Sequence, residues 1–300
     1  MAYTSNKIDM YQQVTDTLVE LLETAGTDWL RPWHDGATHR SITNGRPYRG
    51  INPLLLGCSA LRNSFTANVW GTYKAWAAKG GQVNKGSRGT RIVFWKWTER
   101  QETTDTGEKV TKKSAILRDY VVFNAEQQEG ADVPANEPVD GGAVQFEAAE
   151  SLLESSGATI RHGAGGACYS PALDVISLPA CDAFTETKTC TATESYYGTA
   201  FHELTHWTGA PTRCDRKLAN RFGSEAYAFE ELIAEIGAAY LTAATGLRIE
   251  PRPDHAQYIN NWLKTLKNDK RAVFTAASAA QKAADFVLAT GESEDLEMAA

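Results

Sequence analysis

Acidic residues are missing from a long stretch in the first half of this 300-residue sequence, since none occurs between Asp35 and Glu99. The same 63 positions hold ten lysines or arginines and eight aromatic residues. Over the whole chain the balance is reversed, because 37 Asp and Glu outnumber 30 Lys and Arg. Residues 1–130 carry a surplus of basic groups and residues 131–300 a surplus of acidic ones. This asymmetry predicts two domains with different partners.

The sequence also lacks the features of an exported or membrane-bound protein. No run of about 18 apolar residues occurs, which argues against a membrane-spanning helix. The first residues, MAYTSNKIDM, contain no basic segment followed by an apolar one, so no secretory signal is evident. The five cysteines are odd in number and form no CxxC pair, which argues against a disulfide framework. We therefore expect a cytoplasmic protein with free thiols and no membrane partner.

Hydrophobic periodicity predicts an α+β N-terminal half. Residues 6–25 carry apolar side chains at helical spacing, and a shorter helix is expected over residues 72–79. Two strand-like runs, 90–98 and 116–123, are rich in Val, Ile and aromatic residues. They flank a polar segment around residues 105–107, which indicates a long hairpin or β-ribbon.

A segment with the composition of a linker separates the two halves. Residues 126–142 contain two prolines, three glycines and several acids, with almost no bulky apolar side chain. We therefore predict an N-terminal domain over 1–128, a linker over 129–143 and a C-terminal domain over 144–300.

The C-terminal domain is expected to be mostly helical. The predicted helices cover residues 143–156, about 195–207, 225–245 and 255–267, and a strand is predicted over 173–178. The last ten residues, GESEDLEMAA, are expected to form a frayed acidic tail.

The motif HELTH, residues 202–206, carries the most specific chemistry in the sequence. His202 and His206 are four residues apart, so both imidazoles project from one face of a helix. Two neutral imidazoles at that separation can bind one Zn²⁺, and Glu203 lies beside them as a candidate general base. A chance occurrence of the motif and a degenerate site without activity are the alternatives.

A zinc hydrolase needs a third protein ligand. The segment FEELIAEIGAAYL, residues 229–241, offers Glu230, Glu231 and Glu235 on a helix that is predicted to be buried on most sides. Buried carboxylates need a partner, and a metal ion would provide one. Glu231 and Glu235 share a helical face, so we expect Glu231 to be the ligand and Glu235 to accept the other N–H of a ligand histidine. The two roles could also be reversed.

This residue set is typical of a zinc metallopeptidase of the gluzincin type. The expected cofactor is Zn²⁺, or another divalent metal such as Mn²⁺, and the expected substrate is an unidentified protein or peptide. An extended peptide could align along the strand at 173–178. Four tyrosines are candidates for stabilising an oxyanion, although each is more often a core residue: Tyr169, Tyr196, Tyr197 and Tyr227.

The acid-free segment is suited to single-stranded nucleic acid. Cationic side chains follow phosphates, and aromatic rings stack on unpaired bases. The strand around residues 91–97 carries aromatics on both faces, so either face could bind. The alternative is that the tryptophans form a core. The candidate contact residues are Arg40, Arg46, Tyr48, Arg49, Trp70, Tyr73, Lys74, Trp76, Lys85, Arg88, Arg91, Trp95, Lys96 and Trp97.

The glycine-rich loop at residues 80–89 has some likeness to a phosphate-binding P-loop. It lacks the Lys and Ser/Thr that should follow the second glycine of that motif. Contact with a nucleic-acid backbone suits this loop better than binding of a nucleoside triphosphate.

Several blocks together resemble the ArdC-type antirestriction proteins of conjugative plasmids. In the N-terminal half the resemblance rests on DMYQQVTDTLVELLE, RPW, NGRPYRGIN and WGTYKAW followed by GGQVNKGSRGT. In the C-terminal half it rests on YYGTAFHELTHWTG and YAFEELIAEIGAAYL. The resemblance covers nearly the whole chain, and the order of the blocks is more specific than any one of them.

The resemblance implies an N-terminal domain that binds single-stranded DNA and a C-terminal zincin-like metallopeptidase domain. It also implies protection of incoming plasmid DNA from host restriction. The N-terminal domain of the family is similar to that of plasmid primases. The alternatives are a DNA-binding protein whose metal domain is structural or inactive, and a primase-like activity, which the lack of an acidic metal cluster in the N-terminal half weakens.

Overall fold

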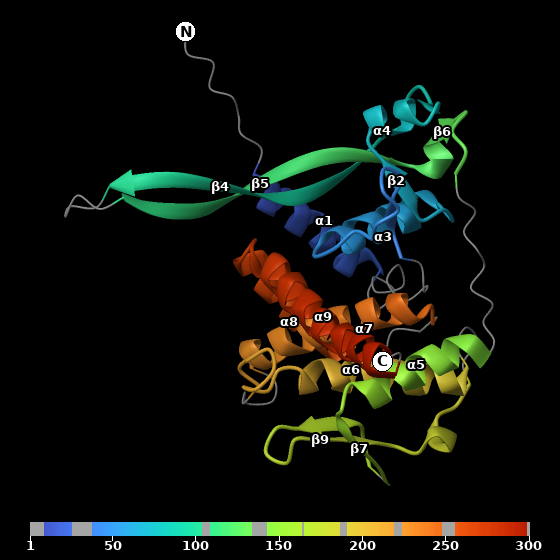
Figure 1. Ribbon diagram of the computed structural model, residues 1–300, viewed down its shortest axis with the longest axis vertical. Coiled ribbons are helices and arrows are strands. Elements are labelled where there is room, and N and C mark those ends of the chain that lie inside the picture. Colours follow the sequence, from blue (N-terminus) through green and yellow to red (C-terminus); the bar gives the residue numbers. More distant parts are fainter. Residues whose placement is uncertain are drawn as a thin grey trace. The chain divides into compact units, whose positions relative to one another are not determined.

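The computed structural model describes residues 9–25, 38–103, 109–133, 143–163, 165–186, 191–218, 224–247 and 256–298. Helices and sheets are mixed, which confirms the α+β class (Figure 1). The chain divides into two compact units. The ribbon unit comprises His39–Tyr48 and Ser59–Ala135, and the helical unit comprises Met1–Thr38, Arg49–Cys58 and Asn136–Ala300.

This division differs from the predicted one on its N-terminal side. The sequence places the first helix in one domain with the basic segment, whereas α1 (Met10–Ala25) belongs to the helical unit and contacts α8 (Ala256–Asn268). Leu18 of α1 is fully buried, and the Thr15 hydroxyl donates a hydrogen bond of 2.9 Å to the carbonyl of Lys270. The end of the ribbon unit, Ala135, falls within the predicted linker.

A four-stranded sheet with the order β1-β2-β5-β4 forms the centre of the ribbon unit. Strand β1 (Arg40–Ser41) pairs in parallel with β2 (Val69–Gly71), which pairs antiparallel with β5 (Lys109–Asn124). Strand β4 (Thr90–Thr103) pairs along its whole length with residues 109–122 of β5, and the two strands form a long hairpin (Figure 1). The predicted β-ribbon is thus confirmed and is longer than expected, while its turn lies outside the described residues.

The ribbon unit also contains several short helices and strands. Helix α4 (Tyr73–Ala78) begins after Thr72, whose side chain accepts a hydrogen bond from the Ala75 N–H, in agreement with the predicted helix. Strand β3 (Gln82–Val83) pairs with β6 (Gln128–Glu129), which follows the 3-10 helix η2 (Ala125–Gln127). The boundary between the units falls within α3 (Asn52–Asn63), a helix that the sequence analysis did not predict.

The helical unit combines a small sheet with long helices. Strands β7 (Thr159–His162), β8 (Cys168–Ser170) and β9 (Val175–Leu178) lie beside α5 (Ala143–Ser155) and α6 (Ala192–Trp207) (Figure 1). Helix α6 also packs against α7 (Glu225–Thr245), and α7 packs against α9 (Ala272–Met298). One core joins Ile176 of β9, Phe201 of α6 and Leu241 of α7. The prediction of a mostly helical C-terminal domain is confirmed.

The prediction that a peptide aligns along residues 173–178 is wrong in this fold. Strand β9 is the central strand of its sheet, with β7 parallel on one side and β8 antiparallel on the other. Both of its backbone edges are therefore already paired, and a peptide cannot add to it.

The acidic tail predicted over the last ten residues is also replaced by regular structure. Helix α9 extends to Met298, and only residues 299–300 of that tail lie outside the description. The helix was missed because its buried stripe is made largely of alanine, including Ala276, Ala280 and Ala284. Alanine gives a weak hydrophobic signal, although its small side chain allows helices to pack closely.

The composition led us to expect no membrane-spanning helix and no disulfide framework. None of the described helices is long and apolar enough to cross a membrane. Four of the five cysteines are free thiols: Cys58, Cys168, Cys181 and Cys214. The fifth, Cys190, lies outside the described residues.

Candidate functional site

Helix α6 presents both histidines of the HELTH motif to one point. Thr191 caps its N-terminus in a capping box with Glu194, which satisfies backbone N–H groups that the first turn leaves unpaired. One helical turn separates His202 and His206, and their Nε2 atoms lie 3.2 Å apart. His202 is buried and His206 nearly so. The predicted geometry of the pair is thus present.

Helix α7 brings Glu231 to the same point. One carboxylate oxygen lies 3.5 Å from His202 Nε2 and the other lies 3.5 Å from His206 Nε2. Two ligand atoms that each lie about 2.1 Å from a tetrahedral ion are about 3.4 Å from one another. The 3.2 Å separation of the two Nε2 atoms is close to this value, and one carboxylate oxygen of Glu231 lies within 4.8 Å of both ligand nitrogens. These three residues therefore form a group that could hold a metal ion.

A close approach between the two helices makes this meeting possible. Gly237 of α7 faces Thr205 of α6, and a Cβ atom at Gly237 would lie 2.4 Å from Thr205 Cγ2. Real Cβ atoms do not approach other atoms so closely, so a larger residue would push the helices apart. The glycine therefore sets the spacing that places Glu231 next to the histidines.

A second carboxylate accompanies each histidine on its other ring nitrogen. Glu235 Oε1 lies 2.6 Å from His202 Nδ1, and Glu230 Oε1 lies 3.2 Å from His206 Nδ1. A carboxylate that accepts the Nδ1 proton leaves the Nε2 lone pair free for a metal. The positions of Glu231 and Glu235 match the preferred assignment of ligand and supporting residue. Glu230 was a candidate from the sequence as well, but no role was predicted for it.

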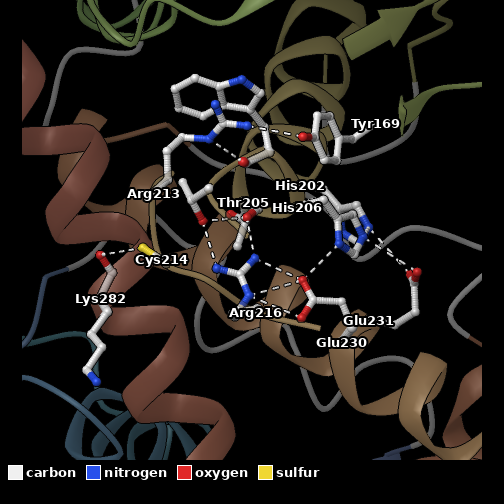
Figure 2. A network of polar contacts seen from close by, with 12 residues as sticks. Tyr169, His202, Thr205, His206, Arg213, Cys214, Arg216, Glu230, Glu231 and Lys282 are labelled. Carbon is white, nitrogen blue, oxygen red and sulfur yellow. Dashed lines mark hydrogen bonds and ion pairs between the residues drawn. The ribbon is translucent and has the colours of Figure 1, made fainter. Parts of the chain in front are cut away.

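Arg216 holds Glu230 in place, a contact that no sequence pattern indicated. Its guanidinium donates hydrogen bonds of 2.9–3.2 Å to the Glu230 carboxylate (Figure 2). It also donates to the Thr205 carbonyl at 2.6 Å and to the Thr208 hydroxyl at 2.8 Å. The guanidinium therefore ties the end of α6 to α7. A local sequence pattern could not reveal it, because Arg216 lies in a loop between the two helices.

The charges at this centre shift one another's pKa values. Burial lowers the pKa of His206, but hydrogen bonds with Glu230 and Glu231 raise it to about 8. Burial raises the pKa of Glu230, yet its hydrogen bonds with His206 and Arg216 hold it below the usual value. The pKa of Glu231 is likewise lowered overall, because its hydrogen bonds to both histidines outweigh its burial. The acids are therefore carboxylates, which can act as ligands and acceptors.

Glu203 lies on α6 directly after His202 and is 4% exposed. Its charge contributes to raising the pKa of His206, which places the carboxylate within electrostatic reach of the centre. Glu203 remains the candidate general base that the motif predicts.

Three of the four candidate tyrosines have partners away from the metal-binding group. Tyr196 contacts His162 Nε2 through its hydroxyl at 2.9 Å, and Tyr197 donates to Glu150 at 2.6 Å. Tyr169 donates to Asp174, which also pairs with Arg213. The fourth, Tyr227, is half-buried on α7. The hydroxyl groups of the first three tyrosines therefore already have side-chain partners in this structure.

The predicted DNA-contact residues separate into exposed and buried sets. Trp70 and Trp76 are fully buried, and their ring N–H groups donate to His39 Nδ1 and to the Phe123 carbonyl. They are core residues and cannot stack on a base without unfolding, so we correct that prediction. The side chains that remain exposed are Arg40, Arg46, Tyr73, Lys74, Lys85, Arg88, Trp95 and Lys96.

The other candidates differ in their surroundings. Arg49 belongs to the helical unit and pairs there with Asp285. Arg91 lies 3.2 Å from Asp119, and Tyr48 is half-buried. Trp97 is part of β4, but its side chain lies outside the described part of the chain.

The glycine-rich loop lines a groove of about 560 Å³ in the ribbon unit. Its walls include Tyr73, Asn84, Lys85, Ser87 and Phe123. Two aromatic rings, a cation and two small polar side chains thus line one open space.

Two family models match successive parts of the sequence. The N-terminal domain of anti-restriction factor ArdC matches residues 8–123, and a zincin-like metallopeptidase family matches residues 147–279. The interval between them, residues 124–146, contains the predicted linker at 129–143. The two matches together cover most of the chain, so the likeness to these families does not depend on any single residue.

Similar proteins extend over nearly the whole chain. Protein y4eC of Sinorhizobium fredii is 39% identical over 93% of this chain and 91% of its own length. The crystal structure of antirestriction protein ArdC from plasmid R388 is 37% identical, with a TM-score of 0.79 and coverage of 95% of this chain and 98% of that one. A Mn(II)-bound structure of the same protein is 36% identical, has a TM-score of 0.76 and covers 94% and 98%.

A DNA primase, TraC of Escherichia coli, is 40% identical over 94% of this chain. The matched region is only 27% of the primase, so this chain corresponds to one part of a much longer protein.

Proposed function

Because this chain belongs to the ArdC family of antirestriction proteins, we propose that it binds single-stranded DNA and uses a metal site to protect incoming plasmid DNA. The zincin-like domain would carry the metal, and the basic, aromatic segment would bind the DNA. The observation that supports the metal site best is the triangle of His202 Nε2, His206 Nε2 and the Glu231 carboxylate.

The proposed cofactor is a divalent metal ion. His202, His206 and Glu231 would hold it, while Glu235 and Glu230 keep the two imidazoles in the required tautomer. Two imidazoles and a carboxylate suit Zn²⁺, and they also accept Mn²⁺, the ion bound in the related crystal structure. Metal analysis of the purified protein tests this assignment, and His202→Ala should lose the ion.

The proposed reaction is hydrolysis of a peptide bond. A bound divalent ion supplies a Lewis acid that polarises the peptide carbonyl and makes a water molecule more acidic. Glu203 would accept the proton of the attacking water and deliver it to the leaving amine. Its burial beside His202 supports this role, since water exclusion strengthens charge interactions in the site.

Replacing Glu203 separates metal binding from hydrolysis. We expect Glu203→Ala to keep its metal and its DNA affinity but to lose most antirestriction activity, since general-base catalysis contributes about 10²–10⁴-fold. The measurements are metal content, oligonucleotide binding and plasmid transfer into a restricting host. If all three stay at the wild-type level, proteolysis is not the mechanism, and the alternative of an inactive or structural metal domain is correct.

The DNA-binding part of the proposal rests on the acid-free, aromatic segment. Affinity for single strands should exceed affinity for a duplex of the same sequence, because exposed rings stack only on unpaired bases. Binding should weaken steeply with salt as counterions are released. Titrations of both forms over a range of salt concentrations test this, and equal, weak binding to both would leave only nonspecific charge attraction.

A primase activity is not proposed. The similarity to TraC covers about a quarter of that primase. Among the described residues, the only group of three or more potential metal ligands is the one in the helical unit.

A further inference from the structure

The β4–β5 hairpin exposes large apolar side chains on both of its faces. Side chains alternate between faces along a strand, and directly paired residues of two strands share a face. Phe94 pairs with Arg118 and Lys96 with Ile116, whereas Trp95 pairs with Leu117. The even-numbered residues from Ile92 to Thr98 and from Ile116 to Val122 lie on one face, which we name the Phe94 face. The odd-numbered residues from Arg91 to Glu99 and Leu117 to Phe123 form the Trp95 face.

Among the described side chains, two exposed aromatic rings lie on the Phe94 face and one, Trp95, lies on the other. Phe94 is 45% exposed and Tyr120 is 50% exposed, and their ring centroids lie 5.6 Å apart in an edge-to-face arrangement. Ile116 on the same face is 43% exposed. The rings are anchored next to buried Ile92 and Val122, so they project from a fixed base. A contiguous exposed apolar patch of this kind is typical of a binding surface.

The charges differ between the two faces. Lys96 and Arg118 are exposed on the Phe94 face, and its described side chains include no carboxylate. The Trp95 face carries Asp119, which pairs with Arg91 at 3.2 Å, and an exposed Glu99. The two cations of the Phe94 face attract a phosphate backbone, whereas on the Trp95 face Asp119 neutralises Arg91 and Glu99 adds a negative charge.

We propose that the Phe94 face is where single-stranded DNA lies, with unpaired bases on Phe94 and Tyr120 and phosphates near Lys96 and Arg118. The inference rests on the proposed DNA-binding function and selects one of two faces that the sequence leaves open. It also adds Phe94, Arg118 and Tyr120 to the contact residues, and it removes Trp95 from them.

The test compares truncations on the two faces of one hairpin. Phe94→Ala and Tyr120→Ala are matched with Trp95→Ala, because all three rings are about half exposed. Binding of a fluorescein-labelled oligothymidylate to the full, metal-loaded chain is followed by fluorescence anisotropy. Loss of one stacked ring should raise Kd about tenfold for each variant on the Phe94 face. Trp95→Ala should leave Kd unchanged.

Conservative variants distinguish stacking from a structural defect. Tyr120→Phe keeps the ring and should retain the wild-type Kd, whereas Tyr120→Leu should lose affinity as the alanine variant does. Lys96→Gln and Arg118→Gln should each reduce the salt dependence of binding, by about 0.7 in the slope of log K against log salt. Photocrosslinking of an iodouracil-substituted strand should label the peptides that contain Phe94 and Tyr120.

The outcomes separate this inference from the function on which it rests. If the wild type does not bind single strands, the DNA-binding function fails. If the wild type binds and Trp95→Ala weakens binding while Phe94→Ala and Tyr120→Ala do not, the chosen face is wrong. Equal affinity of all variants also overturns the inference. If Phe94→Ala instead converts a dimer to a monomer in sedimentation, the face binds a second copy of the chain and not DNA.

Discussion

His202 and His206 are the same type of side chain, yet different contacts hold them. His202 Nδ1 faces Glu235 directly at 2.6 Å, whereas His206 Nδ1 faces Glu230, whose carboxylate is itself held by Arg216. The spacing of the histidines and of Glu231 and Glu235 could be predicted, because four residues make one helical turn. The role of Arg216 could not, since it depends on the path of the loop after α6.

We expect Arg216→Gln to weaken metal affinity about tenfold or more, because residues that support metal ligands typically contribute 10–100-fold. Without the guanidinium, Glu230 can no longer be held in position for His206. Arg216→Lys should weaken affinity less, since it keeps the charge but loses the planar fork of donors. Competition with a chromophoric chelator measures the affinity directly, without any need for activity.

Arg213→Gln is the matched control for this prediction. Arg213 lies in the same loop and is equally buried, but it pairs with Asp174 and stacks on Trp207. The Arg213→Gln variant should keep the wild-type metal affinity, although the loss of these contacts lowers the free energy of unfolding. Equal losses in the two variants would show that the loop, and not the Glu230 contact, determines metal affinity.

The packing of helices and strands against one another determines whether the side chains of the metal site can meet. Sequence periodicity predicted the bounds of α7 and the presence of the two ribbon strands, because each has a pattern of bulky apolar residues, but both strands are longer than predicted. It missed α9, whose buried stripe is mostly alanine, and it could not show that β9 is a central strand. Neither the order of strands in a sheet nor the close packing of α6 on α7 can be predicted from the hydrophobic periodicity of a single segment.

Gly237→Ala tests the approach of α6 to α7. The new methyl group would lie 2.4 Å from Thr205 Cγ2, and such overpacking typically costs about 1–3 kcal/mol. Alanine recovers up to about 1 kcal/mol through its higher helix propensity. The expected result is a lower free energy of unfolding together with weaker metal binding, because Glu231 moves away from the histidines.

The double variant Thr205→Ala with Gly237→Ala provides the control. Removing the Thr205 Cγ2 and hydroxyl atoms makes room for the new methyl group, so the losses of the two single changes should not add. Denaturant unfolding and chelator competition measure both quantities. Strictly additive losses would mean that the clash at this crossing does not control the site.

At the scale of the whole molecule, the chain does not divide at a single point. Composition predicts a linker at residues 129–143, but it could not predict the return of α1 to the helical unit, because the contacts of α1 lie more than two hundred residues away in sequence. Thr15 bonds to Lys270, and Tyr11 packs edge-to-face on Phe274 at 4.8 Å. A helix can be predicted from its own residues, whereas its partner cannot.

Leu18→Ala tests whether α1 belongs energetically to the metal-binding unit. Leu18 is fully buried, so its truncation should lower the free energy of unfolding by about 2–5 kcal/mol. Metal stabilises only the part of the chain that binds it, so added metal identifies the calorimetric transition of the helical unit. The variant should lower that transition and leave the other in place, while Leu61→Ala, at an exposed position in the ribbon unit, should change neither. If Leu18→Ala instead lowers the transition that metal does not affect, α1 is part of the DNA-binding domain, as the division at residue 128 predicts.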